Sequence, residues 1–268
     1  MALIGAIIGD IIGSQYEFKR PAGFDYKTAD LLTDKCRFTD DTVMSLATKY
    51  AVKHCWRSNG IDFTSAYHEL GNRYINVGYG SYFKRWLKER RAEPYGSYGN
   101  GSAMRVSYIG ECFDSISDVD TYAALSAACT HNHPEGILGA TVTAHCIWMA
   151  KHNYTKEDIL AYASVFYPKK NYAFSCMYPL DEIRETYHWD VTCQGSVPAA
   201  IRCVYEANNY TEFVRNVFSL NCDTDTLCAI GGGIAEELFD NETDEIMKQK
   251  DRILEKYLDD YLLGIVKS

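Results

Sequence analysis

The sequence predicts an all-α protein, and three observations support that fold class. Apolar residues recur at helical spacing along most of the 268 residues. Alternating runs of Val, Ile and Thr, which are typical of strands, are absent at useful length. No internal repeat or low-complexity tract divides the chain, and its length suits one hydrophobic core. We therefore expect a compact single-domain orthogonal multi-helix bundle that spans residues 1–268.

The predicted helices follow one another along nearly the whole chain. The first places Gly5, Gly9 and Gly13 four residues apart, a stripe that lets a neighbouring backbone come close. Segment 134–150 carries almost no charge and begins with a proline, so we expect a central helix surrounded on all sides. Segment 167–193 is the least regular and is expected to be a long surface loop. The predicted helices are 3–12, 42–53, 64–75, 81–88, 118–129, 134–150, 155–165, 196–207, 211–218, 226–239 and 244–263.

The composition excludes several classes of function. Lys and Arg total 27 against 36 Asp and Glu, which gives a net charge of −9 without any run of like charge. Nucleic acid and anionic membranes are therefore poor partners. The apolar segment 1–12 lacks a basic flank and is shorter than the ~20 residues that span a bilayer. Ten scattered cysteines without a Cys-x-x-Cys pair are typical of thiols in a reducing compartment. We expect a soluble, cytoplasmic monomer.

Two short acidic clusters stand far apart in the sequence, each directly before a predicted helix. They are Thr39-Asp40-Asp41-Thr42 and Asp223-Thr224-Asp225-Thr226. Either cluster alone is explained by helix capping, in which a side-chain oxygen accepts a free backbone N–H. A cap needs only one carboxylate, however, whereas alternating carboxylates and hydroxyls supply the hard oxygen ligands that Mg²⁺, Mn²⁺ or Ca²⁺ prefers. If the clusters meet, and Glu17 joins them, five carboxylates repel one another unless cations lie between them.

Two further segments have side chains suited to ligand binding. Residues 95–105 interleave glycines with small polar residues, and such a loop forms either an anion cradle or a plain turn. It matches neither the P-loop nor the Rossmann spacing. His131 and His133 precede the proline of the buried helix, and we favour contacts to a substrate or a helix cap over zinc ligation, since no Cys/His set accompanies them.

Five collinear motifs together resemble the ADP-ribosylglycohydrolase family. The match begins with the glycine stripe of 5–13 and Glu17, and continues with Phe38-Thr39-Asp40-Asp41-Thr42 and with Gly99-Asn100-Gly101-Ser102-Ala103-Met104-Arg105. It ends with Thr130-His131-Asn132-His133-Pro134 and Asp223-Thr224-Asp225-Thr226. This family is all-α and uses two divalent cations, usually Mg²⁺ or Mn²⁺. The resemblance therefore implies a dinuclear metal site at the centre of the bundle.

The resemblance also implies a role for each matching residue. The metal ligands would be Thr39, Asp40, Asp41, Asp223, Asp225 and Thr226. Glu17 would be an acid near the metals that serves as a ligand or gate. The phosphates and distal ribose of ADP-ribose would be held by Gly99, Asn100, Gly101, Ser102 and Met104, with Ser97 and Tyr98 beside them and His131 as a further contact. An acid that contacts the leaving group in arginine-specific members is not identified among Asp62, Glu69, Glu89 and Glu93.

The implied reaction is hydrolysis of the C1″ glycosidic bond of an ADP-ribosylated protein or small ADP-ribose conjugate. Its oxocarbenium-like transition state needs an oriented ribose and a delivered water. Asp40 is our choice for the base, with Asp41 as alternative and Glu17 as acid or gate. Two other functions stay open: a metal-dependent pyrophosphohydrolase, and a non-catalytic ADP-ribose binder. An intact carboxylate set argues against the binder, because binding alone has little need of so repulsive a group.

Overall fold

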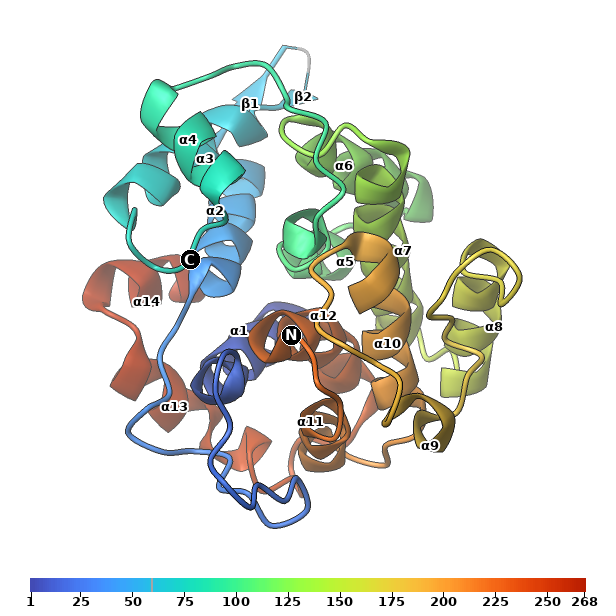
Figure 1. The fold of residues 1–268 in the computed structure, drawn as a ribbon. Helices are drawn as coiled ribbons and strands as arrows, with labels where there is room; N and C mark the ends of the chain where they lie inside the picture. Colours follow the sequence, from blue (N-terminus) through green and yellow to red (C-terminus); the bar gives the residue numbers. More distant parts are fainter. Residues whose placement is uncertain (59) are drawn as a thin grey trace.

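The computed structural model describes residues 1–58 and 60–268 and confirms the all-α fold (Figure 1). Its α-helices are α1 (Ala2–Gly13), α2 (Asp40–His54), α3 (Phe63–Arg73), α4 (Ser81–Glu89), α5 (Ser107–Cys112), α6 (Ile116–Ala128), α7 (Pro134–Lys151), α8 (Lys156–Phe166), α9 (Leu180–Ile183), α10 (Cys193–Tyr205), α11 (Tyr210–Phe218), α12 (Thr224–Leu238), α13 (Lys250–Tyr257) and α14 (Asp260–Lys267). Three 3₁₀ turns are η1 (Ser14–Tyr16), η2 (Asn100–Ser102) and η3 (Met247–Gln249), and an antiparallel hairpin pairs β1 (Trp56–Arg57) with β2 (Gly60–Ile61).

Helices α1 and α12 form the centre of the molecule, with α2 on one side and α7 and α10 on the other (Figure 1). Every residue of α1 is buried. A Cβ built on Gly5 or Gly9 would lie 2.3 or 2.2 Å from a carbonyl oxygen of α12, so the two backbones pack directly against each other. The glycine stripe therefore does what its spacing predicts, and its partner is the helix that begins with the second acidic cluster.

Some predicted elements differ from the observed ones. The helix predicted for 244–263 is three elements, η3, α13 and α14, because Asp259 accepts the backbone N–H of Leu262 and starts a new helix. The predicted loop 167–193 contains the short helix α9. Helix α5 and the hairpin, each too short to show a period, were not predicted.

The prediction that 134–150 is surrounded on all sides is only partly right. Helix α7 is buried around most of its circumference, but Leu138, Thr141, His145 and Trp148 form a half-exposed stripe. The lack of charged residues correctly indicated that most of α7 is buried. It did not indicate which side of the helix faces solvent. Within the described residues, no helix is long and apolar enough to cross a bilayer. The ten cysteines are free thiols.

Candidate active site

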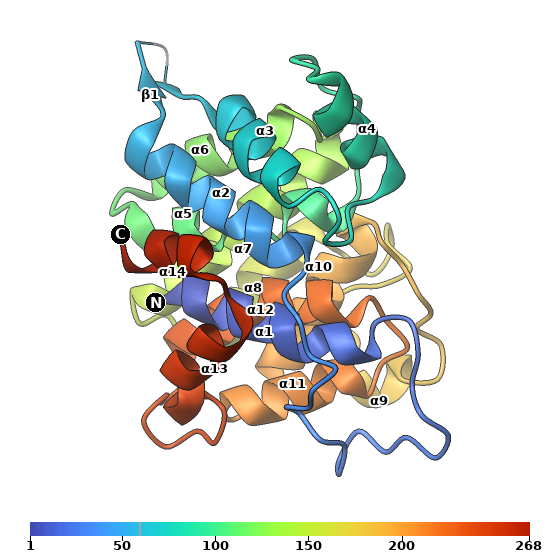
Figure 2. The same ribbon diagram turned by 90° about the vertical axis from the view of Figure 1, so that its left-hand side faces the viewer.

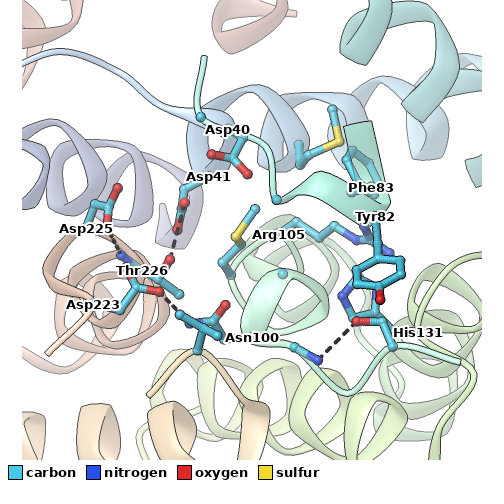
Figure 3. A pocket seen from close by; sticks show the side chains of 18 of the residues that line it. Asp40, Asp41, Tyr82, Phe83, Asn100, Arg105, His131, Asp223, Asp225 and Thr226 are labelled. Atoms are coloured by element: carbon cyan, nitrogen blue, oxygen red, sulfur yellow. Dashed lines mark hydrogen bonds between the residues drawn. The ribbon is translucent and has the colours of Figure 1, made fainter. Parts of the chain in front are cut away.

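A cavity of about 480 Å³ opens where the N-termini of α2 and α12 meet the glycine-rich loop (Figure 3). Carboxylates from both acidic clusters line one end of it. Arg105, His131 and Tyr82 lie at the other end. The two acidic clusters, separated by more than 180 residues, are therefore brought into one site, as the metal hypothesis requires.

The first acidic cluster is held in place by a carboxylate of α1. Asp10, which is fully buried, accepts the backbone N–H of Thr39 at 2.9 Å and of Thr42 at 3.1 Å, together with both threonine hydroxyls. The Thr39 hydroxyl also caps α2 by accepting the N–H of Asp41 at 3.3 Å. Capping is thus done by the threonine and by Asp10, which leaves the Asp41 carboxylate turned toward the cavity.

The second acidic cluster begins α12 without a side-chain cap. The Asp223 carboxylate instead accepts the amide Nδ2–H of Asn100 at 2.8 Å. Asp225 accepts the backbone N–H of Thr226 at 3.0 Å, and the Thr226 hydroxyl donates to Asp41 across the cavity at 3.4 Å. Helix capping therefore does not explain this cluster, because its carboxylates point into the site.

The carboxylates form two groups that share one member. Oxygens of Asp10, Asp41 and Asp225 lie within 4.8 Å of one another, and so do oxygens of Glu17, Asp223 and Asp225. Oxygen Oδ1 of Asp41 is buried without a hydrogen-bond donor among the described residues. A buried carboxylate oxygen without a donor is costly unless a cation satisfies it. An all-oxygen donor set of this kind fits a hard divalent cation.

Crowding shifts the protonation of these acids. Burial, and then the Asp10 carboxylate, raises the pKa of Asp40 to about 8. Burial, and then Asp223, raises the pKa of Glu17 to about 7. Burial and neighbouring carboxylates hold the pKa of Asp41 and of Asp225 well above the usual range. Without cations, the site therefore holds protons near neutral pH, and cation binding must displace them.

Asp40 lies on the cavity wall outside both carboxylate groups. A Cβ on Gly78 would come within 2.8 Å of its Oδ1, so the loop before α4 passes close over this carboxylate. Glu17 follows the 3₁₀ turn after α1 and is 3.7 Å from the exposed Arg37 guanidinium. Of the six residues with an implied metal role, Asp41, Asp223 and Asp225 belong to the groups, while Thr39, Asp40 and Thr226 lie beside them.

The glycine-rich loop forms the opposite part of the cavity wall. Ser97, Gly99, Asn100, Gly101 and Met104 line the cavity. Two other residues of the expected binding set do not line it. Ser102 is fully buried and donates to the carbonyl of Gly136 at 2.7 Å, and Tyr98 is exposed against the His133 ring.

The two histidines of the fourth motif have separate places. His133 caps α7 by accepting the N–H of Glu135 at 3.1 Å, and His131 lines the cavity. The expected helix cap is thus made by His133, while the expected substrate contact of His131 stays a prediction. The four acids considered for the leaving group, Asp62, Glu69, Glu89 and Glu93, do not line this cavity.

Sequence reasoning gave no role to four residues of the site. Asp10 is the single charge in an otherwise apolar helix, a signal that was visible in the sequence. Arg105 belongs to one of the five motifs, but the resemblance implied no function for it. In the structure this residue is buried and lines the cavity. Phe18 and Trp189 stack at 5.7 Å between ring centroids on the cavity wall, and nothing in their local sequence marks them.

Known proteins resemble this chain over most of its length. The family model described as ADP-ribosylglycohydrolase matches residues 1–235. The ADP-ribosylhydrolase ARH3 of Gallus gallus is 23% identical over 310 residues, which cover 90% of this chain and 84% of the chicken protein. The ARH3 proteins of Homo sapiens and Mus musculus are 29% and 30% identical over 190 residues. These two matches cover 58% of this chain and about half, 50%, of each relative.

The fold resembles that of a solved structure described as an ADP-ribosylglycohydrolase-related protein complex. The TM-score is 0.69 at 18% sequence identity, and the match covers 99% of this chain and 95% of that chain. At this identity the likeness concerns the fold.

Proposed function

Because this chain belongs to the ADP-ribosylglycohydrolase family, we propose that it is a metal-dependent hydrolase that releases ADP-ribose from an ADP-ribosylated acceptor. The bond cleaved would be the C1″ glycosidic bond, in a protein conjugate or a small ADP-ribose conjugate. The observation that carries this proposal is the pair of carboxylate groups that share Asp225 at one end of a cavity. A site that only bound ADP-ribose would gain nothing from so many repelling carboxylates.

We propose that two Mg²⁺ or Mn²⁺ ions occupy the carboxylate groups. Asp10, Asp41 and Asp225 would hold one, and Glu17, Asp223 and Asp225 the other, with Thr39, Asp40 and Thr226 near enough to complete either shell. When bound, the cations would supply positive charge for the ribose hydroxyls and the attacking water.

The residues of the chain would handle the protons. Water attacks C1″ and the bond from C1″ to the acceptor breaks, while Asp40, or alternatively Asp41, accepts the proton that the water loses. The departing acceptor takes up one proton. Glu17, at the edge of the carboxylates, is the proposed donor where it serves as the acid, and Asp223 and Asp225 then hold the second cation without it. Bound cations would favour ionisation of Asp40, because burial and neighbouring carboxylates otherwise raise its pKa to about 8.

The substrate's two halves would occupy different walls. We place the phosphates and distal ribose along Ser97, Gly99, Gly101, Met104 and His131, which line the cavity wall opposite the carboxylates. Ser102 and Tyr98 would support this wall from outside. The acceptor would then lie beside Glu17 at the stacked rings of Phe18 and Trp189.

The proposed setting is the cytoplasm, a reducing compartment in which the ten free thiols would stay unpaired, and the proposed oligomeric state is a monomer. A net charge of −9 argues against nucleic acid as the carrier of the modification.

A panel of defined conjugates tests the function directly. Arginine- and serine-linked ADP-ribosyl peptides and O-acetyl-ADP-ribose are incubated with the protein in Mg²⁺ or Mn²⁺, and the products are separated by chromatography. We expect free ADP-ribose from at least one linkage and none after chelation. AMP as the product would favour a pyrophosphohydrolase instead, and calorimetric binding of ADP-ribose without hydrolysis of any conjugate would favour a binder.

A further inference from the structure

The guanidinium of Arg105 is a buried cation without a carboxylate partner among the described residues. Its side chain is 1% exposed and lies over the Tyr67 ring, 4.2 Å from the centroid. Nitrogen Nη2 donates to the carbonyl of Ser126 at 2.8 Å and to the hydroxyl of Thr130 at 2.9 Å. Both hydrogens of this nitrogen are therefore used, and one of them fixes the Thr130 oxygen as an acceptor.

The Thr130 hydroxyl also contacts the histidine that lines the cavity. Its Oγ1 lies 2.7 Å from Nδ1 of His131, and Thr130 is fully buried. A hydroxyl has one hydrogen to donate. Since its oxygen already accepts from Arg105, Nδ1 is the one acceptor recorded for that hydrogen among the described residues. The neutral imidazole must then carry its own proton on Nε2.

The other side of the imidazole faces the glycine-rich loop (Figure 3). A Cβ on Gly101 would lie 3.3 Å from Nε2 of His131, and one on Gly99 would lie 3.7 Å away. Behind the ring, Gly136 of α7 packs so closely that a Cβ there would be 3.0 Å from the Cβ of His131. The Cβ of His131 thus packs against α7, and Nε2 faces Gly99 and Gly101 of the loop, which carry no side chains there.

We propose that Arg105 and Thr130 are positioning residues that hold His131 as its Nε2–H tautomer, so that this N–H donates to an oxygen of the bound ligand. The choice of ligand rests on the proposed function, which makes the acceptor a phosphoryl or hydroxyl oxygen of the ADP-ribosyl group. Burial and the Arg105 charge hold the pKa of His131 well below its usual range, so the ring is neutral when it donates. Arg105 acts through Thr130 and does not itself touch the ligand in this proposal.

The tautomer is measured by ¹⁵N NMR of the histidine side chains in the full chain at pH 7, with His131 assigned through His131→Gln. We expect a protonated Nε2 and an unprotonated Nδ1 in the native protein, a result that needs no variant to fold. A protonated Nδ1 would overturn the proposal.

Three threonine variants link the tautomer to binding. Thr130→Val removes the hydroxyl at nearly constant volume, and we expect a mixed tautomer and a Kd for ADP-ribose weakened roughly 5- to 10-fold. Thr130→Ser keeps the hydroxyl and should restore both. Thr143→Val is the matched control, because the Thr143 hydroxyl is also buried, has no hydrogen-bond partner in the part of the chain that the structure describes, and does not line the cavity. It should leave the His131 signals and the Kd unchanged.

An unchanged tautomer and a Kd within twofold in Thr130→Val would also overturn the proposal. If the native protein does not bind ADP-ribose at all, the proposed function fails, whereas the tautomer still decides the role of Arg105 and Thr130.

Discussion

The two ends of the cavity are built from different material (Figure 3). The carboxylate end is formed by helix termini: Asp10 near the end of α1, the start of α2 and the start of α12. The histidine end is formed by the glycine-rich loop and by His131 before α7. The carboxylate end gathers several acids whose ionisation is disfavoured by burial. The histidine end has neutral hydrogen-bond donors, with the buried guanidinium of Arg105 behind them.

This difference shows that the two ends depend on different interactions with the surrounding structure. The carboxylates repel one another, so the packing of α1 against α12 must force them together, and positive helix N-termini reduce only part of the cost. The histidine end has no comparable charge repulsion. Its shape comes from the hydrogen bond between Thr130 and His131 and from glycines that leave space beside the ring. We therefore expect changes at the carboxylate end to alter stability and metal binding together, and changes at the histidine end to alter ligand affinity alone. Figure 2 shows α2 above α1, with the loop that connects the two helices at the lower right.

The largest expected effect is at the shared carboxylate. Asp225→Asn should remove a ligand of both cations and with it about 4 kcal/mol of transition-state stabilisation, so that kcat falls roughly 1000-fold. Without cations, the same variant should unfold at a higher temperature than the native protein, because the amide carries neither a charge that its neighbours repel nor a proton that the folded site must retain. Steady-state kinetics and thermal unfolding in chelator measure the two effects. Turnover within tenfold of the native rate would contradict the two-metal site.

The contact between α1 and α12 is expected to come next. Gly9→Ala would place a Cβ 2.2 Å from the carbonyl oxygen of Cys228. Separating the helices should lower the free energy of unfolding by about 3 kcal/mol and weaken Mg²⁺ binding. Gly264→Ala in α14 is the matched control, since a Cβ there meets nothing within 4 Å, and it should stabilise the protein by about 0.5–1 kcal/mol. Equal stability of the two variants in urea unfolding would refute this role of the stripe.

Asp10 should link stability to metal affinity. Asp10→Asn keeps one of the two oxygens that hold the start of α2, so we expect a loss of about 2 kcal/mol and Mg²⁺ affinity lowered roughly 10- to 100-fold. Asp244→Asn is the control, because Asp244 is equally buried and accepts three backbone N–H groups far from the cavity. Calorimetry should show weaker Mg²⁺ binding in the first variant alone; a similar loss in both would reduce Asp10 to a structural role.

The two ends should also respond differently to pH. The folded-state pKa values of Glu17, about 7, and Asp40, about 8, exceed the ordinary values of 4.5 and 3.8, so the folded chain binds more protons than the unfolded one. Their contribution to stability is complete below about pH 4 and is lost as pH rises through 7 to 8. In chelator, the melting temperature should therefore fall between pH 6.5 and 8.5, whereas with Mg²⁺ it should not, because the cations take the place of the protons. His131 shifts in the opposite direction: its folded-state pKa lies well below the ordinary 6.5, so the unfolded chain binds more protons near pH 6.5 and His131 adds stability as pH rises to about 7.5.

The smallest effect is expected at the glycine-rich loop. Gly101→Ala would place a methyl group 3.3 Å from Nε2 of His131, and it should weaken ADP-ribose binding about 5-fold while changing stability by less than about 0.5 kcal/mol. Gly80→Ala, which lines the same cavity with nothing within 4 Å of its Cβ, should leave the affinity unchanged. A large drop in melting temperature for Gly101→Ala would contradict the expectation that changes at the histidine end alter ligand affinity alone.

Much of the fold was predictable because most of its helices are long. Segment 42–53 is several turns long, and segment 134–150 is a long, nearly uncharged stretch that begins with a proline. They correspond to α2 and α7 with ends shifted by at most two residues. Short elements were not predictable, since α5, α9 and the hairpin contain too few residues to establish a period. The break before α14 was missed because apolar spacing continues across it, and only the cap by Asp259 marks the new start.

The site divides in the same way. Asp41, Asp223 and Asp225 were identified because several carboxylates beside a helix start exceed what capping needs. Asp10 was not, because a single acid in an apolar helix has no local partner from which to infer its contacts.

The helical fold class, the two acidic clusters and the glycine stripe could be read from the sequence, since each depends on residues a few positions apart. Three relations became visible in the folded chain alone: α12 is the partner of α1, Asp225 is common to both carboxylate groups, and Thr130 connects Arg105 to His131. These relations join residues far apart in the chain or depend on which way a hydroxyl and a ring are turned. Tertiary packing determines these contacts and orientations, so they cannot be read from the order of residues along the chain.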